Sequence, residues 1–178
     1  KTLLIPNSIP IENYRFNPAR SFEDIALFYV RAIEKIYNPE MAIRVAKSLD
    51  EKKLKVSLGM VGPFKDNSID DCKELVDQLA LADRITFFGR LAKAEWIEKS
   101  EAYNVFINTT NVDNTPVSVI EAMALGLPVV STNVGGIPFL LEDGVDALLV
   151  EPNDEEAMCR AIERLKSCLL YTSPSPRD

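Results

Sequence analysis

Short apolar runs alternate along the chain with longer segments in which apolar and polar residues share a helical spacing. Six continuous apolar runs predict strands covered on both faces, at residues 25–30, 54–61, 84–88, 103–107, 128–131 and 147–150. Five segments between or after them predict helices, at residues 39–49, 69–81, 93–99, 116–125 and 155–166. This alternation predicts an α/β fold: a Rossmann-like parallel sheet with helices on both faces and right-handed crossovers.

The stretch 103–137 contains the most informative local pattern. Residues 108–114 are mostly polar turn formers, Thr115 is a good N-cap, and Pro116 suits a first helical position because its missing N–H costs nothing there. A helix start presents free N–H groups and about half a positive charge. We therefore expect this helix start to bind an anion, with phosphate as the leading candidate.

Two carboxylates flank that helix start. Asp113 lies just before it, and Glu121 lies on the helix at the border of its apolar face. Glu121 is only about 7.5 Å along the axis from the first helical residue, and helical side chains lean toward the N-terminus. Farther on, Gly135 and Gly136 form a loop in which the backbone can come close to a ligand.

These residues resemble the sequence motif of a known enzyme family. The stretch 113–138, DNTPVSVIEAMALGLPVVSTNVGGIP, resembles the donor-site motif of family 4 retaining glycosyltransferases, which have the GT-B fold. That motif has two acids separated by seven residues, then an EAMA-x-G-x-PVV run and a Gly-Gly turn. A looser likeness extends from about Leu3 to Leu165. The resemblance implies one half of a two-domain GT-B enzyme, the half that binds a nucleotide-diphosphate sugar for transfer to an acceptor.

The resemblance also implies roles for individual residues. Arg31, a planar fork at a strand end, would hold two phosphate oxygens, and Glu121 would accept hydrogen bonds from the ribose hydroxyls. Asp113 would contact the transferred sugar, so Asp113 and Arg31 are the expected catalytic residues. The other expected donor-binding residues are Lys35, Gly62, Leu91, Thr109, Asn114, Thr115, Pro116, Val117, Ser118, Gly135 and Gly136.

Three positions depart from the family pattern. Asp113 replaces the usual Glu, Phe139 stands where an acid is common, and Ile36 occupies the place of a frequent Lys, with Lys35 one position short. Each main assignment also competes with a structural role. Arg31 could simply end a strand, Glu121 could pair with a basic side chain, and Asp113 could be an ordinary loop residue.

Composition limits the function classes. The 178 residues are 47% hydrophobic and 26% charged, and the net charge of −7 argues against nucleic acid as a partner. The absence of histidine excludes histidine-based triads and disfavours zinc chemistry. No D-x-D pair is present, so we expect no metal and no cofactor beyond the nucleotide-sugar substrate. No apolar run approaches the roughly 20 residues of a membrane span, and no signal peptide is visible. A cytoplasmic enzyme is the default.

The two ends suggest the domain limits. We expect residues 1–20 to be the end of a preceding domain or a linker, residues 21–167 the nucleotide-sugar domain, and residues 168–178 a non-native, disordered tail. The last eleven residues, CLLYTSPSPRD, resemble a translated sequencing-library adapter. By the family analogy, the acceptor, and any peripheral membrane contact, would come through a missing N-terminal domain. This chain alone should then be inactive.

Two other functions remain open. The chain could be a nucleotide-binding module without transferase activity, or a nucleotide-sugar epimerase of similar fold, although the usual epimerase histidine is absent. A nicotinamide dehydrogenase is disfavoured because no G-x-G-x-x-G follows a strand.

Overall fold

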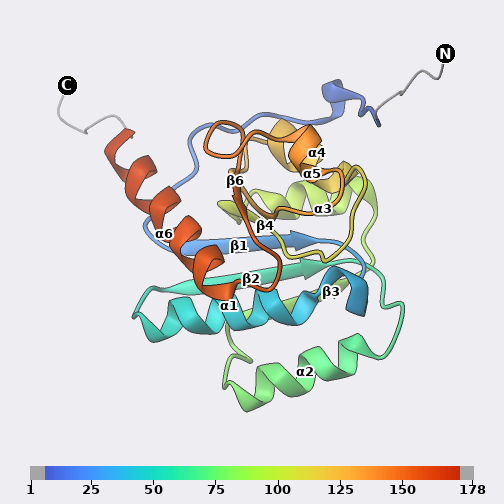
Figure 1. The fold of residues 1–178 in the computed structure, drawn as a ribbon, viewed down its shortest axis with the longest axis vertical. Coiled ribbons are helices and arrows are strands. Elements are labelled where there is room, and N and C mark those ends of the chain that lie inside the picture. Colours follow the sequence, from blue (N-terminus) through green and yellow to red (C-terminus); the bar gives the residue numbers. More distant parts are fainter. Residues whose placement is uncertain (1–6, 173–178) are drawn as a thin grey trace.

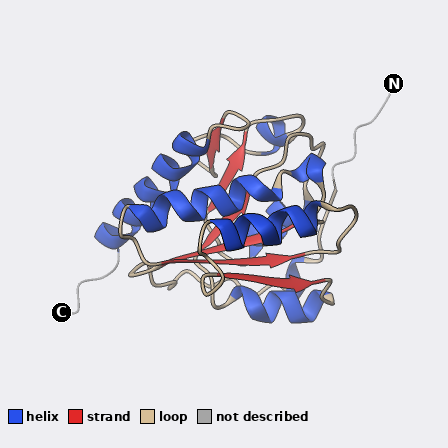
Figure 2. Cartoon of the chain, turned by 90° about the horizontal axis from the view of Figure 1, so that it is seen from below, coloured by secondary structure: helices blue, strands red, loops and turns tan. Residues whose placement is uncertain are grey.

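The computed structural model describes residues 7–172 and places a six-stranded sheet between two layers of helices (Figures 1 and 2). The strands are β1 (Ile25–Val30), β2 (Val56–Val61), β3 (Ile85–Gly89), β4 (Val105–Asn108), β5 (Val129–Thr132) and β6 (Leu148–Val150). The α-helices are α1 (Pro39–Glu51), α2 (Ser68–Gln78), α3 (Lys93–Ser100), α4 (Val117–Ala124), α5 (Ile137–Leu140) and α6 (Glu155–Thr172). Two short 3₁₀ helices are η1 (Ile11–Asn13) and η2 (Lys35–Tyr37).

All neighbouring strands are parallel, in the order β3-β2-β1-β4-β5-β6. The predicted α/β, Rossmann-like fold is therefore confirmed. The chain moves outward from β1 to β3 and then returns to place β4 on the other side of β1. In sheets of this kind, ligands bind beyond the carboxyl ends of the strands at such a reversal. The topology thus directs attention to the loops after β1 and β4.

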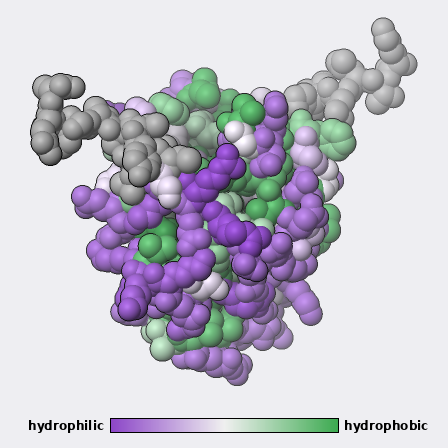
Figure 3. Space-filling view, turned by 60° about the vertical axis from the view of Figure 1, so that its left-hand side comes forward, coloured by the Kyte–Doolittle hydropathy of each residue, from purple (hydrophilic) through white to green (hydrophobic). Residues whose placement is uncertain are grey.

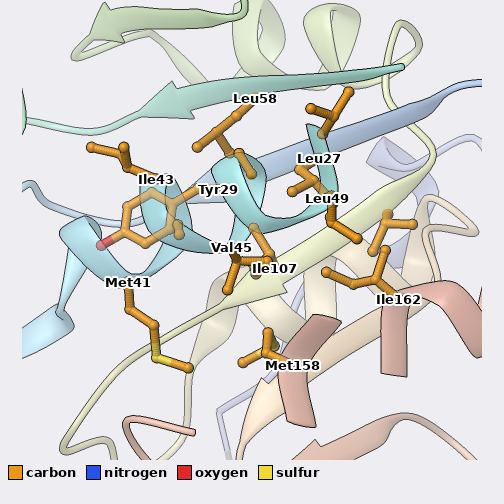
Figure 4. Close-up of a cluster of buried hydrophobic side chains, with 14 of the residues drawn as sticks. Leu27, Tyr29, Met41, Ile43, Val45, Leu49, Leu58, Ile107, Met158 and Ile162 are labelled. Carbon is orange, nitrogen blue, oxygen red and sulfur yellow. The ribbon is translucent and has the colours of Figure 1, made fainter. Parts of the chain in front are cut away.

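The continuous apolar runs arise because the sheet is covered on both faces. On β1, Leu27 and Tyr29 pack toward α1, α2 and α6, while Phe28 between them packs toward α3, α4 and α5. On β4, Ile107 and Phe106 divide between the same two layers. Figure 4 shows side chains of the first layer, with Met158 and Ile162 of α6 closing over the strands. Alternate residues of each strand therefore fill two separate cores.

One face of the molecule can be described by its hydropathy. On the face shown in Figure 3, hydrophilic residues cover most of the surface and hydrophobic ones form small areas between them. None of the helices within the described residues is long and apolar enough to cross a membrane.

Apart from shifts of one to three residues at the ends of several other elements, three expectations about local structure need correction. Helix α4 begins at Val117, not Pro116: Pro116 is the cap residue, with an extended ψ of 105° and no capping side chain. The short helix α5 stands where only a loop was expected. Helix α6, with Asp154 as its predicted cap, continues to Thr172, so the expected absence of structure is wrong for residues 168–172. Residues 173–178 lie outside the described part, and the foreign origin of the tail stays a prediction.

The segment before β1 is attached to this domain. Arg20 donates to the carbonyl oxygens of Ser100, Tyr103 and Leu125 at 2.8, 2.7 and 3.1 Å. The amide of Asn17 also donates to Leu125 O at 3.2 Å, so residues 17–20 are held against the ends of α3 and α4. The expectation that residues 1–20 close a preceding domain or form a linker stays a prediction, and residues 1–6 lie outside the described part.

Candidate functional site

A pocket of about 430 Å³ opens at the carboxyl ends of β1, β2 and β3, beside the start of α4. Its lining includes four residues that were predicted to bind the ligand, namely Arg31, Gly62, Leu91 and Ser118. Tyr37, Arg90 and Trp96 line it too and were not among the named donor-binding residues. A larger hollow of about 820 Å³ lies at the opposite edge of the sheet, among residues such as Asp24 and Lys55. We take the smaller pocket as the site because parallel sheets bind ligands at the carboxyl edge.

Arg31 and Asp113 meet at this edge. Arg31 follows β1, Asp113 lies in the loop after β4, and Nη2 of Arg31 is 2.5 Å from Oδ2 of Asp113. The contact joins opposite charges without hydrogen-bond geometry. Nε of Arg31 and Oδ2 of Asp113 are both buried without a hydrogen-bond partner among the described residues. A buried polar atom without a hydrogen bond is costly, so the ion pair is the main interaction that offsets the burial of these two groups.

The Arg31 guanidinium is fixed by its neighbours. Its central carbon lies 4.3 Å from the centroid of the Tyr37 ring, a cation–π arrangement. Next to it, a Cβ on Gly62 would lie 1.9 Å from the carbonyl oxygen of Arg31. Only glycine allows the ends of β1 and β2 to come this close. The contacts of Gly62 therefore position the backbone of Arg31, and direct contact of Gly62 with a ligand stays a prediction.

The start of α4 supplies free backbone donors. The first helical bonds run from the amides of Val119 and Ile120 to Pro116 O at 3.1 and 3.4 Å. The amides of Val117 and Ser118 precede them and find no backbone acceptor within the described residues. Because Ser118 also lines the pocket, this helix start can present N–H groups to an anion there.

Glu121, three residues after Ser118, is 4% exposed and already has partners. The hydroxyl of Tyr14 donates to its Oε1 at 2.7 Å, and Nζ of Lys93 contacts the same oxygen. Burial, followed by this bond to Glu121, raises the pKa of Tyr14, so Tyr14 is a proton donor at every ordinary pH. The structure thus contains the pairing of Glu121 with a basic side chain. Its contact with a ribose stays a prediction.

Asp113 is held by the glycine loop. The amide of Gly136 donates to Asp113 O at 2.9 Å. A Cβ on Gly135 would lie 1.9 Å from that oxygen, and one on Gly136 would lie 1.5 Å from Asn114 O. The close backbone approach expected here is therefore with the chain's own loop 113–114. Burial raises the pKa of Asp113, and the charge of Arg31 opposes that rise.

The remaining predicted residues are more dispersed. Thr109 is fully buried, and its hydroxyl donates to Asn38 O at 2.8 Å. Thr115 accepts a 3.1 Å bond from Asn7 at its carbonyl oxygen, whereas Asn114 is exposed. Lys35 is exposed on η2, and its amide donates to Asp66 at 3.1 Å. These contacts show how the loops are held, and none of them tests the predicted roles in binding.

The sequence contained a usable signal for some of the missed residues. Arg90 directly follows β3, as Arg31 follows β1, so its position alone placed it at the carboxyl edge. Tyr14, Lys93 and Trp96 reach the site only through packing, and nothing in the local pattern indicated it. Within residues 7–172, no group of three or more acidic, cysteine or histidine side chains is arranged to hold a metal ion.

The fold and sequence are similar to known proteins. The family described as "Glycosyl transferases group 1" matches residues 10–169. D-inositol 3-phosphate glycosyltransferase from Mycobacterium marinum is 27% identical over 143 residues, which cover 80% of this chain and 30% of that protein. The corresponding enzyme of Thermobifida fusca is 23% identical over 150 residues, covering 80% of this chain and 35% of its own. The chain thus spans about a third of the length of these curated relatives.

Two solved structures show the same fold. Sucrose-phosphate synthase from Thermosynechococcus elongatus has a TM-score of 0.83 at 23% identity, covering 96% of this chain and 45% of its own. Anabaena Alr3699/HepE, solved in complex with UDP-glucose, has a TM-score of 0.82 at 18% identity, covering 93% and 48%. The sheet therefore matches one half of a GT-B structure. Since the family match spans nearly the whole chain, this protein belongs to the glycosyl transferases group 1 family.

Proposed function

We propose that this chain binds the nucleotide-diphosphate sugar donor of a glycosyltransferase. The observation that carries the proposal is the convergence of Arg31, Arg90 and the start of α4 at Ser118 on one pocket. Two arginines line one pocket of a chain with a net charge of −7, and the planar donor fork of a guanidinium suits the oxygens of a diphosphate. The complex of Anabaena HepE with UDP-glucose supports a uridine nucleotide as the first probe.

The reaction proposed for the complete enzyme is transfer of the glycosyl group with retention, of the family 4 type, without a metal ion. The positive groups at the pocket would stabilise the charge that develops on the leaving diphosphate. Asp113, beside Arg31, would contact the transferred sugar. The acceptor would come from a separate domain, because the cleft between two domains is where water is excluded and the acceptor is positioned. The 178-residue chain would then bind donor without transferring it.

Binding by the 178-residue chain tests the proposal. Trp96 is the only tryptophan and lines the pocket, so its fluorescence should change on titration with UDP. We expect UDP to bind more tightly than uridine, because only the diphosphate engages the arginines and the helix start. Calorimetry with UDP, GDP and ADP then identifies the base. Binding of none of the three, by a folded chain, would contradict the proposal.

A further inference from the structure

Oε1 of Glu121 is held by two side chains from distant parts of the sequence. Tyr14 lies in the segment before β1, and its hydroxyl donates at 2.7 Å. Lys93 is the first residue of α3, and its ammonium contacts the same oxygen. We call Tyr14 and Lys93 the Glu121 clamp. Both side chains contact Oε1, so the two carboxylate oxygens differ in how many donors they already have.

Oε2 of Glu121 is the oxygen that remains. A carboxylate oxygen offers about two lone-pair positions, and the clamp uses both positions of Oε1. Within residues 7–172, Oε2 accepts no hydrogen bond, yet it is not one of the fully buried polar atoms that lack a partner. Among residues 7–172, this oxygen is therefore the one that has no donor, in a residue that is 4% exposed.

The clamp adjoins the pocket. Nζ of Lys93 lies 5.1 Å from the centroid of the Trp96 ring, and Trp96 lines the pocket. Ser118, another lining residue, is one turn before Glu121 on the same side of α4. Lys93 and Glu121 therefore each lie next to a residue that lines the pocket.

Resting on the proposed function, we propose that Tyr14 and Lys93 are positioning residues, which orient Glu121 so that ribose hydroxyls bind through Oε2 alone. Two donors on the same oxygen restrict rotation of the carboxylate. A carboxylate oxygen that is oriented in advance gains more binding free energy from a hydroxyl than one that must be ordered when the ligand binds. The clamp therefore sets the preference for a ribose over a 2′-deoxyribose.

The test compares UDP with 2′-deoxy-UDP by calorimetry on the 178-residue chain. Tyr14→Phe and Lys93→Met each remove one part of the clamp. For each variant we expect the Kd of UDP to rise about tenfold and that of 2′-deoxy-UDP to change much less, because the lost interaction is a charged hydrogen bond. Lys93→Arg should restore most of the preference.

Two matched substitutions control for general effects. Lys99→Met removes the other lysine of α3, which lies over the Phe88 ring, and Tyr103→Phe removes another partly buried tyrosine hydroxyl. Both should leave the ratio of the two Kd values unchanged. A structural role for the clamp would weaken both ligands equally.

Four outcomes overturn the inference. Equal losses for the two ligands, or no loss, exclude a positioning role. Tighter binding of UDP to Lys93→Met would mean that Lys93 competes with the ribose for Glu121. A wild-type chain that binds none of UDP, GDP and ADP overturns the proposed function and this inference with it, whereas normal UDP binding by all variants overturns the clamp alone.

Discussion

The guanidinium of Arg31 lies 2.5 Å from the carboxylate of Asp113, at the point where the strand order reverses between β1 and β4. The two side chains are 22% and 6% exposed, so the pair is largely withdrawn from water. The residues expected to hold the phosphate and the sugar thus contact each other. Removing the charge of either residue leaves the other without its counter-charge.

Replacing Arg31 by Ala should weaken the binding of UDP much more than that of uridine. The guanidinium can engage only the diphosphate, and a charged hydrogen bond contributes about 1.5–3 kcal/mol. The free energy of unfolding should also fall, by about 3 kcal/mol, because Asp113 is left buried without its counter-charge. Calorimetry and urea denaturation measure the two effects.

Arg84 provides the matched control for that experiment. It lies at the opposite edge of the sheet, beside Asp50 and Asp83, and its side chain is 35% exposed. Arg84→Ala should leave both ligands unaffected. Equal losses of UDP and uridine binding in Arg31→Ala would rule out a phosphate contact.

Asp113 should make stability depend on pH. Burial raises its folded-state pKa, so above the ordinary value of 3.8 the folded chain retains a proton that the unfolded chain has released. The contribution of Asp113 to stability therefore falls as the pH rises through that interval. Asp113→Asn removes this dependence, so its free energy of unfolding should improve relative to wild type between pH 4 and pH 7.

Urea denaturation of both proteins at the two pH values measures that difference. The control is Asp83→Asn, at a side chain that is 79% exposed. A constant difference between wild type and Asp113→Asn across this pH range would show that burial of Asp113 does not govern its titration.

The sheet could be predicted from sequence because apolar periodicity reports directly on burial. The run at residues 25–30 gave β1 with both ends correct, since each of its faces packs on a separate helical layer. The start of α4 was misplaced by one residue because propensity favours Pro116 at the first helical position, whereas here its carbonyl oxygen caps the helix.

The site could be predicted only where topology decides position. Arg31 and Ser118 come together in one pocket because a strand end and a helix start share the carboxyl edge. The partners of Glu121 were not predictable, because Tyr14 and Lys93 approach it across 107 and 28 residues of sequence. Local patterns carry no information about such contacts. Gly135 and Gly136 make the expected close backbone approach to the chain's own loop 113–114, and their contact with a ligand stays a prediction.

Gly136→Ala should destabilise the chain and disturb the loop that holds Asp113. The new Cβ would lie 1.5 Å from Asn114 O, a backbone atom that can yield only if the loop moves. Overpacking of this kind costs about 1–3 kcal/mol, and UDP-sugar binding should weaken with it. Thermal denaturation and calorimetry measure both changes.

Gly144→Ala separates steric from conformational effects. Gly144 has a positive φ of 76° and nothing within 4 Å of its Cβ position, so an alanine there meets backbone strain alone. It should cost about 1 kcal/mol without affecting ligand binding. If Gly136→Ala behaved like Gly144→Ala in both measurements, the contact with loop 113–114 would have no functional importance.

Substitutions of the two acids, Glu121 and Asp113, should weaken the binding of different ligands. If Glu121 binds the ribose and Asp113 the transferred sugar, Glu121→Gln weakens UDP and UDP-glucose alike, whereas Asp113→Asn weakens only UDP-glucose. Each loss should be about 1.5–3 kcal/mol, the range for a hydrogen bond to a charged group. Amides replace the carboxylates here because they keep the side-chain volume of two buried residues.

Calorimetry with two variants and two ligands gives the four affinities that decide between the roles. Because Asp113 also contacts Arg31, Asp113→Asn frees the guanidinium and could tighten UDP slightly, which still separates the two acids. Equal weakening of UDP and UDP-glucose by Asp113→Asn would instead mean that Asp113 acts only by orienting Arg31 on the diphosphate. Unchanged affinity of folded Glu121→Gln for both ligands would leave Glu121 as a structural partner of Lys93 and Tyr14.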